Sequence, residues 1–277
     1  MFSSFVVLVN IFVRGINMVP AASIVFMVIS CAVGFLLPIG LLIYFRKVKQ
    51  ADLLPFFVGA AVMILFAFVL ESSVHQIVLS SPQGAVIRNN VFLYGIYGGF
   101  MAALFEETGR LLAFRYILKK DKDANALMYG AGHGGIEAVI ILGISMINNL
   151  AYSITLNSGA KDALIASVPA ETAPQLEQVF SQLINTPPWQ FLLGSVERVF
   201  AVVFHLAASV LVWIAVKRGG KKMFAAAFLI HFLIDCVTAI TAGLGVPTRL
   251  VEILIGIMTA AAVLFTRKAA RDYSYQP

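Results

Sequence analysis

The chain has 277 residues, of which 60% are hydrophobic and only 12% are charged. Its mean hydropathy of +0.90 lies above the range of ordinary soluble domains. Apolar runs of about 20 residues, the length that crosses a hydrocarbon core of roughly 30 Å, recur along the whole sequence. The composition therefore predicts an all-α, polytopic integral membrane protein and leaves no segment for a sizeable soluble domain.

The formal charge of +6 does not indicate a nucleic-acid partner, because nearly all basic residues fall in short loops between hydrophobic runs. We expect no nucleic-acid binding. Cys31 and Cys236 both lie within apolar runs, so we interpret them as small packing residues and not as a disulfide or a zinc pair.

Seven membrane spans are predicted. They cover about residues 19–45, 53–79, 90–114, 127–156, 189–216, 222–243 and 247–266. Lysine and arginine cluster after the first, third, fifth and seventh spans, whereas the opposite loops hold few basic residues. The positive-inside rule therefore predicts an outer N-terminus and a cytoplasmic C-terminus. We expect one integral membrane domain over residues 1–277, located in a bacterial plasma membrane.

Two segments lie outside this scheme. The apolar stretch "FSSFVVLVNIFV" near the start is too short to span, so we expect an interfacial or re-entrant segment, with a short eighth span as the alternative. In the long outer loop over about residues 157–188, Thr172 as N-cap and Pro174 in the first turn predict an amphipathic helix. This helix either packs on the bundle or acts as a lid.

Several ionisable residues fall inside the predicted spans. They are Glu106, Glu107 and Arg110 in the third span, His133 and Glu137 in the fourth, His205 in the fifth, and His231 with Asp235 in the sixth. Each costs about 2.5–3.5 kcal/mol at a helix centre on insertion scales, so such residues face the bundle interior and need partners. The third, fourth and sixth spans each carry two of them four residues apart, on one helix face.

These residues are also expected to lie at a common depth. Counted from the cytoplasmic lysines at about 1.5 Å per residue, they lie roughly 14–22 Å into the membrane. Glycines accompany them: Gly95 and Gly99 form a GxxxG face, and four glycines between Gly130 and Gly135 allow a neighbouring helix to approach closely. Four helices are therefore expected to present their polar groups to one buried chamber.

The chemistry of this set suggests hydrolysis. A carboxylate in a dry pocket can take a proton from water, a guanidinium can hold a second carboxylate ionised, and histidines can donate hydrogen bonds to an oxyanion. The same histidines and carboxylates could instead hold a divalent metal such as zinc. The ligands would then be His133, Glu137, His205 and His231.

The pattern "EETGR", then "GAGHGGIE", then a histidine in the fifth span and "HFLID" in the sixth, resembles the YhfC-type intramembrane peptidases. These are similar to the anti-sigma-factor protease PrsW and to the CAAX-protease/bacteriocin-immunity membrane proteases. The resemblance covers the third to sixth spans and, through a first span of the "LLPIGLLIYFRK" type, most of the chain.

The resemblance implies a glutamate-dependent intramembrane endopeptidase acting on a membrane protein or peptide. Glu106 and Glu107 match the paired glutamates, one of which activates water, and Arg110 matches the basic residue that closes this motif. His133 or Glu137 matches the polar position of the second motif.

His205 matches a later histidine motif, and His231 with Asp235 matches the pair that polarises the carbonyl. The CAAX-protease group has a first motif one residue longer and commonly ends in HxxxN, where this chain has HxxxD. The PrsW-like side is therefore better supported.

Other interpretations remain open at this point. The buried charges could serve only as a structural network or as the relay of a proton-coupled transporter, although no internal repeat is found. A non-enzymatic immunity or scaffold protein is a third alternative. Glu71 with His75 and Glu252 are expected at the membrane interface, Arg198 is expected to snorkel, and Glu197 is expected to play at most a supporting part.

Overall fold

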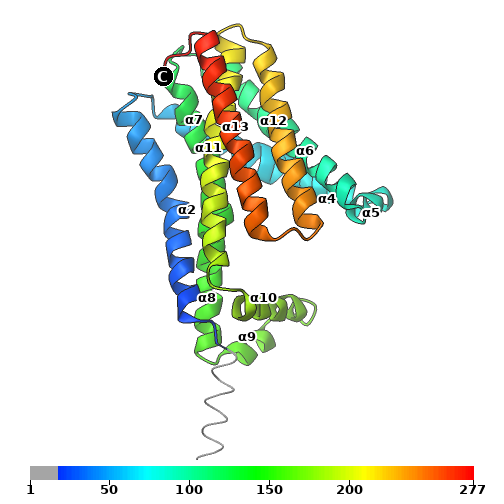
Figure 1. Cartoon of the computed structure of the whole chain (residues 1–277). Coiled ribbons are helices and arrows are strands. Elements are labelled where there is room, and N and C mark those ends of the chain that lie inside the picture. The colour runs from blue at the N-terminus through cyan, green and yellow to red at the C-terminus, as the bar shows by residue number, and fades with distance from the viewer. Residues whose placement is uncertain (1–17) are drawn as a thin grey trace, which may run out of the picture. The chain divides into compact units, whose positions relative to one another are not determined.

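The computed structural model describes residues 18–277, and every regular element in that part of the chain is a helix (Figure 1). This confirms the predicted all-α class. The short apolar segment expected to be interfacial or re-entrant lies outside the described residues.

The helices follow one another closely along the chain. In the first half they are α2 (Ala21–Lys47), α3 (Leu54–Met63), η1 (Ile64–Glu71), α4 (Ser72–Ser80), α5 (Pro82–Arg88), α6 (Val91–Leu112), η2 (Ala113–Ile117) and α7 (Ala124–Ala138). In the second half they are η3 (Val139–Ile144), α8 (Ser145–Asn157), α9 (Lys161–Ser167), α10 (Ala173–Asn185), α11 (Gln190–Lys217), α12 (Lys222–Gly243) and α13 (Thr248–Asp272).

Six continuous helices among the described residues are long and apolar enough to cross a membrane. They cover Ala21–Lys47, Leu54–Ser80, Ala124–Asn157, Gln190–Lys217, Lys222–Gly243 and Thr248–Asp272. Helix α6, with its continuation η2, has the required length but is less apolar because it carries Glu106, Glu107 and Arg110. The chain is therefore a multi-pass membrane protein, and the count of seven spans and their orientation stay predictions.

The chain divides into two compact units. One comprises the described residues up to Val33 together with Ile140–Ser195, and the other comprises Gly34–Val139 with Val196–Pro277. All eight residues that the sequence suggests for the site belong to the second unit.

Helix α10 of the first unit is amphipathic. Phe180 and Leu183 are buried and join a cluster with Leu156. Thr172 stands at the N-cap position, but its hydroxyl donates to the carbonyl of Pro169 at 2.8 Å and does not cap the helix. The apolar face is thus packed within its own unit, and a position on the outer membrane surface stays a prediction.

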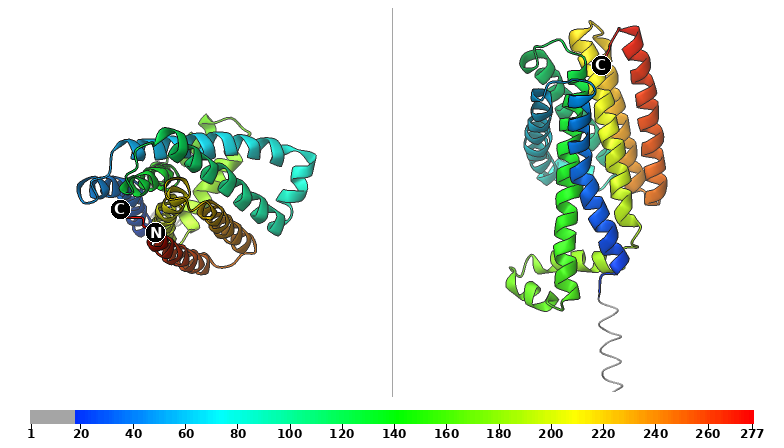
Figure 2. Two further views of the ribbon diagram at one scale, coloured as in Figure 1. Left: turned by 90° about the horizontal axis from the view of Figure 1, so that it is seen from above. Right: turned by 90° about the vertical axis from the view of Figure 1, so that its left-hand side faces the viewer.

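In the second unit, α6 and α12 pack against each other through glycines. A Cβ atom on Gly99 would lie 2.7 Å from both the Phe232 carbonyl oxygen and the Cys236 nitrogen, and one on Gly95 would lie 3.0 Å from the Cys236 carbonyl oxygen. The predicted GxxxG contact is therefore confirmed. Helix α12 also packs against α13, which runs alongside it (Figure 2).

Helix α7 passes between α3 and α11 with little more than backbone at its contacts. A Cβ atom on Gly130 would lie 2.8 Å from the His205 carbonyl oxygen, and one on Gly134 would lie 2.9 Å from Cδ2 of the same histidine. On the other side, a Cβ atom on Gly132 would collide with the carbonyl oxygen of Phe56. The glycines of this segment therefore do what the sequence predicts, and they bring the polar face of α7 close to α11.

In the described part of the chain, three π-helical segments lie within or at the end of long helices, and each is near an ionisable residue. Glu71 ends η1, η2 begins three residues after Arg110, and η3 begins two residues after Glu137. π-Helical turns are uncommon and occur frequently at functional sites.

The start of α7 is anchored by polar contacts outside the spans. The Asp123 carboxylate accepts from Trp213 Nε1 at 2.7 Å and from the Gln276 backbone nitrogen at 2.8 Å. Asn125 Nδ2 donates to Asp52 at 3.2 Å, and this hydrogen bond is the main cause that lowers the pKa of Asp52. These contacts fix where α7 begins relative to α3 and α11.

The glycine contacts of α7 give a first prediction. Gly132→Ala should lower the Tm of the detergent-solubilised protein by several degrees, because the added methyl group overpacks the contact with Phe56 at a cost of about 1–3 kcal/mol. Gly40→Ala is the matched control, since no atom lies within 4 Å of a Cβ at that helical glycine. Equal melting temperatures for the two variants would contradict the close approach of α3 and α7.

Candidate active site

Helix α6 contributes a fully buried ion pair. The side chains of Glu107 and Arg110 have no exposed surface, and Arg110 Nη1 donates to Glu107 Oε1. Their spacing of three residues places them one turn apart on one face of the helix. Removing either partner would leave a buried charge unpaired, at a cost of about 3–5 kcal/mol. The pair therefore explains how a membrane helix carries these two charges.

Glu106 lies among three histidines from three other helices. Its Oε2 atom is 2.9 Å from His133 Nε2 and 3.8 Å from His205 Nδ1, and its Oε1 atom is 3.9 Å from His231 Nε2. The four residues come from α6, α7, α11 and α12. The structure thus brings together the residues that the sequence places at one depth.

Two of these histidines are held from behind by other carboxylates. His205 Nε2 lies 2.9 Å from Glu137 Oε2, and His231 Nδ1 lies 2.8 Å from Glu107 Oε1. A proton on each of these nitrogens completes the hydrogen bond and leaves the other ring nitrogen as a lone pair directed toward Glu106. Arg110 Nη2 supports this assignment, because it lies 3.2 Å from His205 Nδ1, where a donor requires an acceptor.

Within residues 18–277, one group of three side chains has donor atoms that all lie within 4.8 Å of one another: Glu106, His133 and His205. Two imidazole nitrogens and a carboxylate oxygen form a ligand set of the kind found at catalytic zinc. Nε2 of His205, the ring nitrogen that faces away from Glu106, is hydrogen-bonded to the Glu137 carboxylate. Such a bond is usual for a histidine that binds a metal. The residues present therefore fit a divalent cation.

Glu137 is not part of this group, although the sequence suggested it as a ligand. It lies behind His205, bonded to the ring nitrogen that faces away from Glu106. The carboxylate in the group is that of Glu106, which the sequence did not suggest as a ligand. The fourth suggested ligand, His231, does not belong to this group either. Its Nε2 atom lies 3.3 Å from Asp235 Oδ2.

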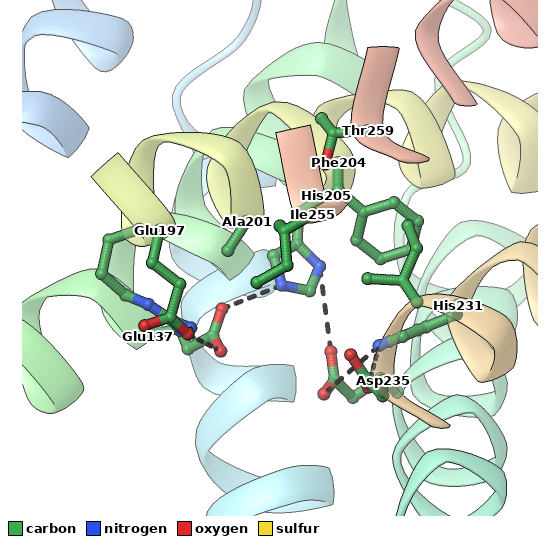
Figure 3. A pocket seen from close by; sticks show the side chains of 12 residues that line it. Glu137, Glu197, Ala201, Phe204, His205, His231, Asp235, Ile255 and Thr259 are labelled. Carbon is green, nitrogen blue, oxygen red and sulfur yellow. Dashed lines mark hydrogen bonds and ion pairs between the residues drawn. The ribbon is translucent and has the colours of Figure 1, made fainter. Parts of the chain in front are cut away.

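A cavity of about 80 Å³, called here the active-site cavity, opens next to these groups (Figure 3). It is lined by Glu106, Glu137, Glu197, Arg198, Ala201, Phe204, His205, His231, Ile234, Asp235, Ile255 and Thr259. The Asp235 side chain is 40% exposed, whereas Glu106 is 8% exposed. Glu107 is absent from the lining, so the two adjacent glutamates differ: one reaches the cavity and the other supports its neighbours.

Arg198 is a member of the site that the sequence assigned wrongly. It does not snorkel to the membrane surface: its side chain is 11% exposed, Nη1 donates to Glu137 Oε1 at 2.7 Å, and Nη2 donates to Glu197. It precedes His205 by seven residues, two helical turns, and therefore shares its face of α11. This seven-residue spacing is the sequence signal from which Arg198 could have been placed beside His205.

Three further side chains were not identified from the sequence as parts of the buried interior. Tyr129 is fully buried, stacks on His133 with ring centroids 5.7 Å apart, and has no hydrogen-bond partner for its hydroxyl among the described residues. Glu71 is buried and pairs with His75 at 3.0 Å. Glu252 is buried as well, and the interfacial depth expected for both glutamates stays a prediction.

The fold and the site define a multi-pass helical membrane protein with a buried centre of histidines and carboxylates next to a cavity. The chain belongs to the YhfC family: residues 33–259 match the family model described as YhfC intramembrane metalloprotease. It is 36% identical over 260 residues to the uncharacterized membrane protein YhfC of Bacillus subtilis strain 168, covering 92% of this chain and all of that protein. No solved structure matches the chain significantly.

The Arg198–Glu137 pair gives a second prediction. Arg198→Gln should lower the free energy of unfolding by about 3–5 kcal/mol, because it leaves the Glu137 carboxylate buried without its cation. The double variant Arg198→Gln/Glu137→Gln should recover most of this loss. Thermal unfolding of the detergent-solubilised variants measures both effects.

Glu197→Gln is the control for this cycle. It removes a partner of Arg198 that is 37% exposed, so we expect a loss below about 1 kcal/mol. If the separate effects of Arg198→Gln and Glu137→Gln on the free energy of unfolding simply add up in the double variant, a direct buried pairing is contradicted.

Proposed function

We propose that the protein is an intramembrane endopeptidase that hydrolyses a peptide bond of a membrane protein or peptide with the help of a divalent cation. One observation supports this proposal above all: three histidines surround Glu106. In two of them, the ring nitrogen that faces away from Glu106 is held by another carboxylate. A purely structural salt bridge has no need of this arrangement. A bound metal needs it, because carboxylates behind the histidines orient the ligands and increase their basicity.

Glu106, His133 and His205 would hold the cation. When bound, a divalent ion supplies Lewis acidity, which polarises a carbonyl and lowers the pKa of water. The charges of the site support this assignment. Glu107 and Glu137 have guanidinium partners, whereas Glu106 and Asp235 have none within residues 18–277, so a dication would compensate the remaining negative charge.

The remaining residues have distinct tasks in this proposal. Asp235 lies in the cavity and is the carboxylate free to accept the proton of the attacking water, since Glu106 serves as a ligand. His231, held through Nδ1 by Glu107, presents Nε2 to the same cavity. Protonated at Nε2, it donates a hydrogen bond to the oxyanion that forms on the peptide carbonyl and then gives that proton to the leaving amine. Asp235, whose Oδ2 atom lies 3.3 Å from His231 Nε2, passes the proton taken from water on to the histidine.

A metal-free glutamic mechanism is the second candidate. It is favoured by the short contact of 2.9 Å between Glu106 Oε2 and His133 Nε2, which forms a carboxylate–imidazole pair beside the cavity. In that mechanism Glu106 itself accepts the proton, and His231 with Asp235 polarises the carbonyl. Glu107 is not the base in either mechanism, because Arg110 and His231 occupy its Oε1 atom and it does not line the cavity.

We also propose that the protein resides in a bacterial plasma membrane with its C-terminus in the cytoplasm. The distribution of lysine and arginine between alternate loops supports this orientation. The Bacillus subtilis relative, described as a membrane protein, supports the location.

The third prediction concerns catalysis. Glu106→Gln should reduce cleavage by on the order of 1,000-fold, because the amide can neither bind a cation well nor accept a proton. The measurement uses purified protein in liposomes with a panel of synthetic single-span peptides, each with a Leu/Ala core flanked by lysines, and mass spectrometry of the products. Glu171→Gln, at an exposed turn, is the control and should cleave normally. Unimpaired cleavage by Glu106→Gln would overturn the proposal.

The fourth prediction separates the two mechanisms. Elemental analysis of the purified protein should find about one divalent ion per chain, and His133→Ala or His205→Ala should lose it. A chelator should remove metal and cleavage together, and the same ion should restore both. Asp235→Asn should abolish cleavage in the metal-dependent mechanism but only weaken it in the glutamic one. Full cleavage by metal-free protein would establish the glutamic alternative.

A further inference from the structure

A second cavity, of about 310 Å³, lies between α4, α6 and α12 and is called here the α4–α6–α12 cavity. It is lined by His75, Leu79, Tyr94, Tyr97, Gly98, Gly99, Asp235 and Ala239. Asp235 also lines the active-site cavity. The residue to which the proposed mechanism assigns the proton transfer therefore lines both cavities.

The glycines of α6 shape this cavity. Gly99 packs directly on the backbone of α12, whereas a Cβ atom on Gly98, the next residue, would have no other atom within 4 Å. Close helix packing at one glycine thus leaves open space at its neighbour. A substrate chain can approach the backbone of α6 at Gly98 without meeting a side chain there.

Two polar side chains of the wall, His75 and Tyr97, are bonded to each other. His75 Nδ1 lies 3.0 Å from the Tyr97 hydroxyl, and His75 Nε2 lies 3.0 Å from Oε1 of the buried Glu71. The other polar side chains among the lining residues are Tyr94 and Asp235. Leu79, Ala239, the two glycines and the tyrosine rings make up the remainder, so the cavity suits an apolar side chain that lies next to the Asp235 carboxylate.

Resting on the proposed function, we propose that the α4–α6–α12 cavity binds a bulky apolar side chain of the substrate, next to the peptide bond that is cleaved. The active-site cavity, about 80 Å³, holds the reacting groups but has no room for such a side chain. The second cavity has a volume at the lower end of the range for ligand sites, which is about 300–1,000 Å³. A membrane-spanning substrate is rich in apolar side chains of this kind.

The test is a change of specificity. The peptide panel is made with Ala, Leu or Phe at one varied position in the core, and cleavage of each peptide is compared between variants. Wild-type protein should cleave the Phe and Leu peptides faster than the Ala peptide. Gly98→Leu, whose Cβ atom meets no other atom within 4 Å, adds a bulky side chain to the cavity wall and should lower the ratio of Phe to Ala cleavage by about tenfold or more. Gly40→Leu is the matched control, because it adds the same side chain at another open helical glycine.

A second readout does not require cleavage. Peptides carrying a photo-reactive leucine at the varied position are irradiated with the inactive Glu106→Gln protein, and the cross-linked residues are mapped by mass spectrometry. Cross-links should fall on Leu79, Tyr94, Tyr97 or Ala239 and should be lost in the Glu106→Gln/Gly98→Leu protein. Smaller fills such as Gly98→Ala give a graded series if the leucine variant is unstable.

The outcomes distinguish the two proposals. Cleavage that is insensitive to Gly98→Leu, or the absence of any cross-link within the cavity, overturns the side-chain pocket and leaves the peptidase intact. Specific cross-links that Gly98→Leu abolishes, without cleavage of any peptide by wild-type protein, support the binding pocket and count against the peptidase.

Discussion

The contacts that His133 and Glu137 make in the buried site depend on the close packing of α7 between α3 and α11, with glycine backbone at the contact on both sides. A Cβ atom at Gly130 would lie 2.8 Å from the His205 carbonyl oxygen and one at Gly134 would lie 2.9 Å from its Cδ2 atom, so a side chain at either position would force α11 to shift, and His205 with it. The present distance of 3.8 Å between His205 Nδ1 and Glu106 Oε2 depends on this close packing. Backbone packing, which is also how small residues associate helices in lipid, therefore sets the geometry of the charged groups.

The carboxylates form two sets with different tasks. Among the described residues, Glu106 and Asp235 line the cavity without an arginine partner, whereas Glu137 lines it but is paired with Arg198. Glu107 and Glu137 are each neutralised by an arginine, and each fixes one histidine ring. This division explains why so many ionisable side chains are needed for one site. The carboxylates that are paired with arginines keep the histidine rings oriented toward Glu106. A flexible carboxylate without such a partner could not hold a ring in this way in a low-dielectric interior.

Much of the fold and of the site could be predicted from the sequence, because the relevant signals are local. Long apolar runs give the helices, and pairs of ionisable residues four positions apart give the polar faces. The different roles of Glu106 and Glu107 could not be predicted, since adjacent residues point about 100° apart and only the packing decides which one faces the cavity.

Arg198 was missed for a different reason. Its partner lies on another helix, and a depth count cannot show that a long side chain reaches across to Glu137. Tyr129 is an aromatic residue in an apolar stretch, and its stacking on His133 follows only from the structure. The π-helical turns have no recognised sequence signal, so the positions of η1, η2 and η3 follow only from the structure.

The pairing of charges also bears on biogenesis. Glu107 and Arg110 neutralise each other within one helix, so during synthesis α6 enters the bilayer with two of its three charges already paired. Glu137 is different, because its arginine belongs to α11, which the ribosome makes later. Until that helix arrives, α7 carries a carboxylate without a partner, at a cost of about 2.5–3.5 kcal/mol on insertion scales. The joining of α7 with α11 is thus the step at which the nascent chain gains a stable membrane position.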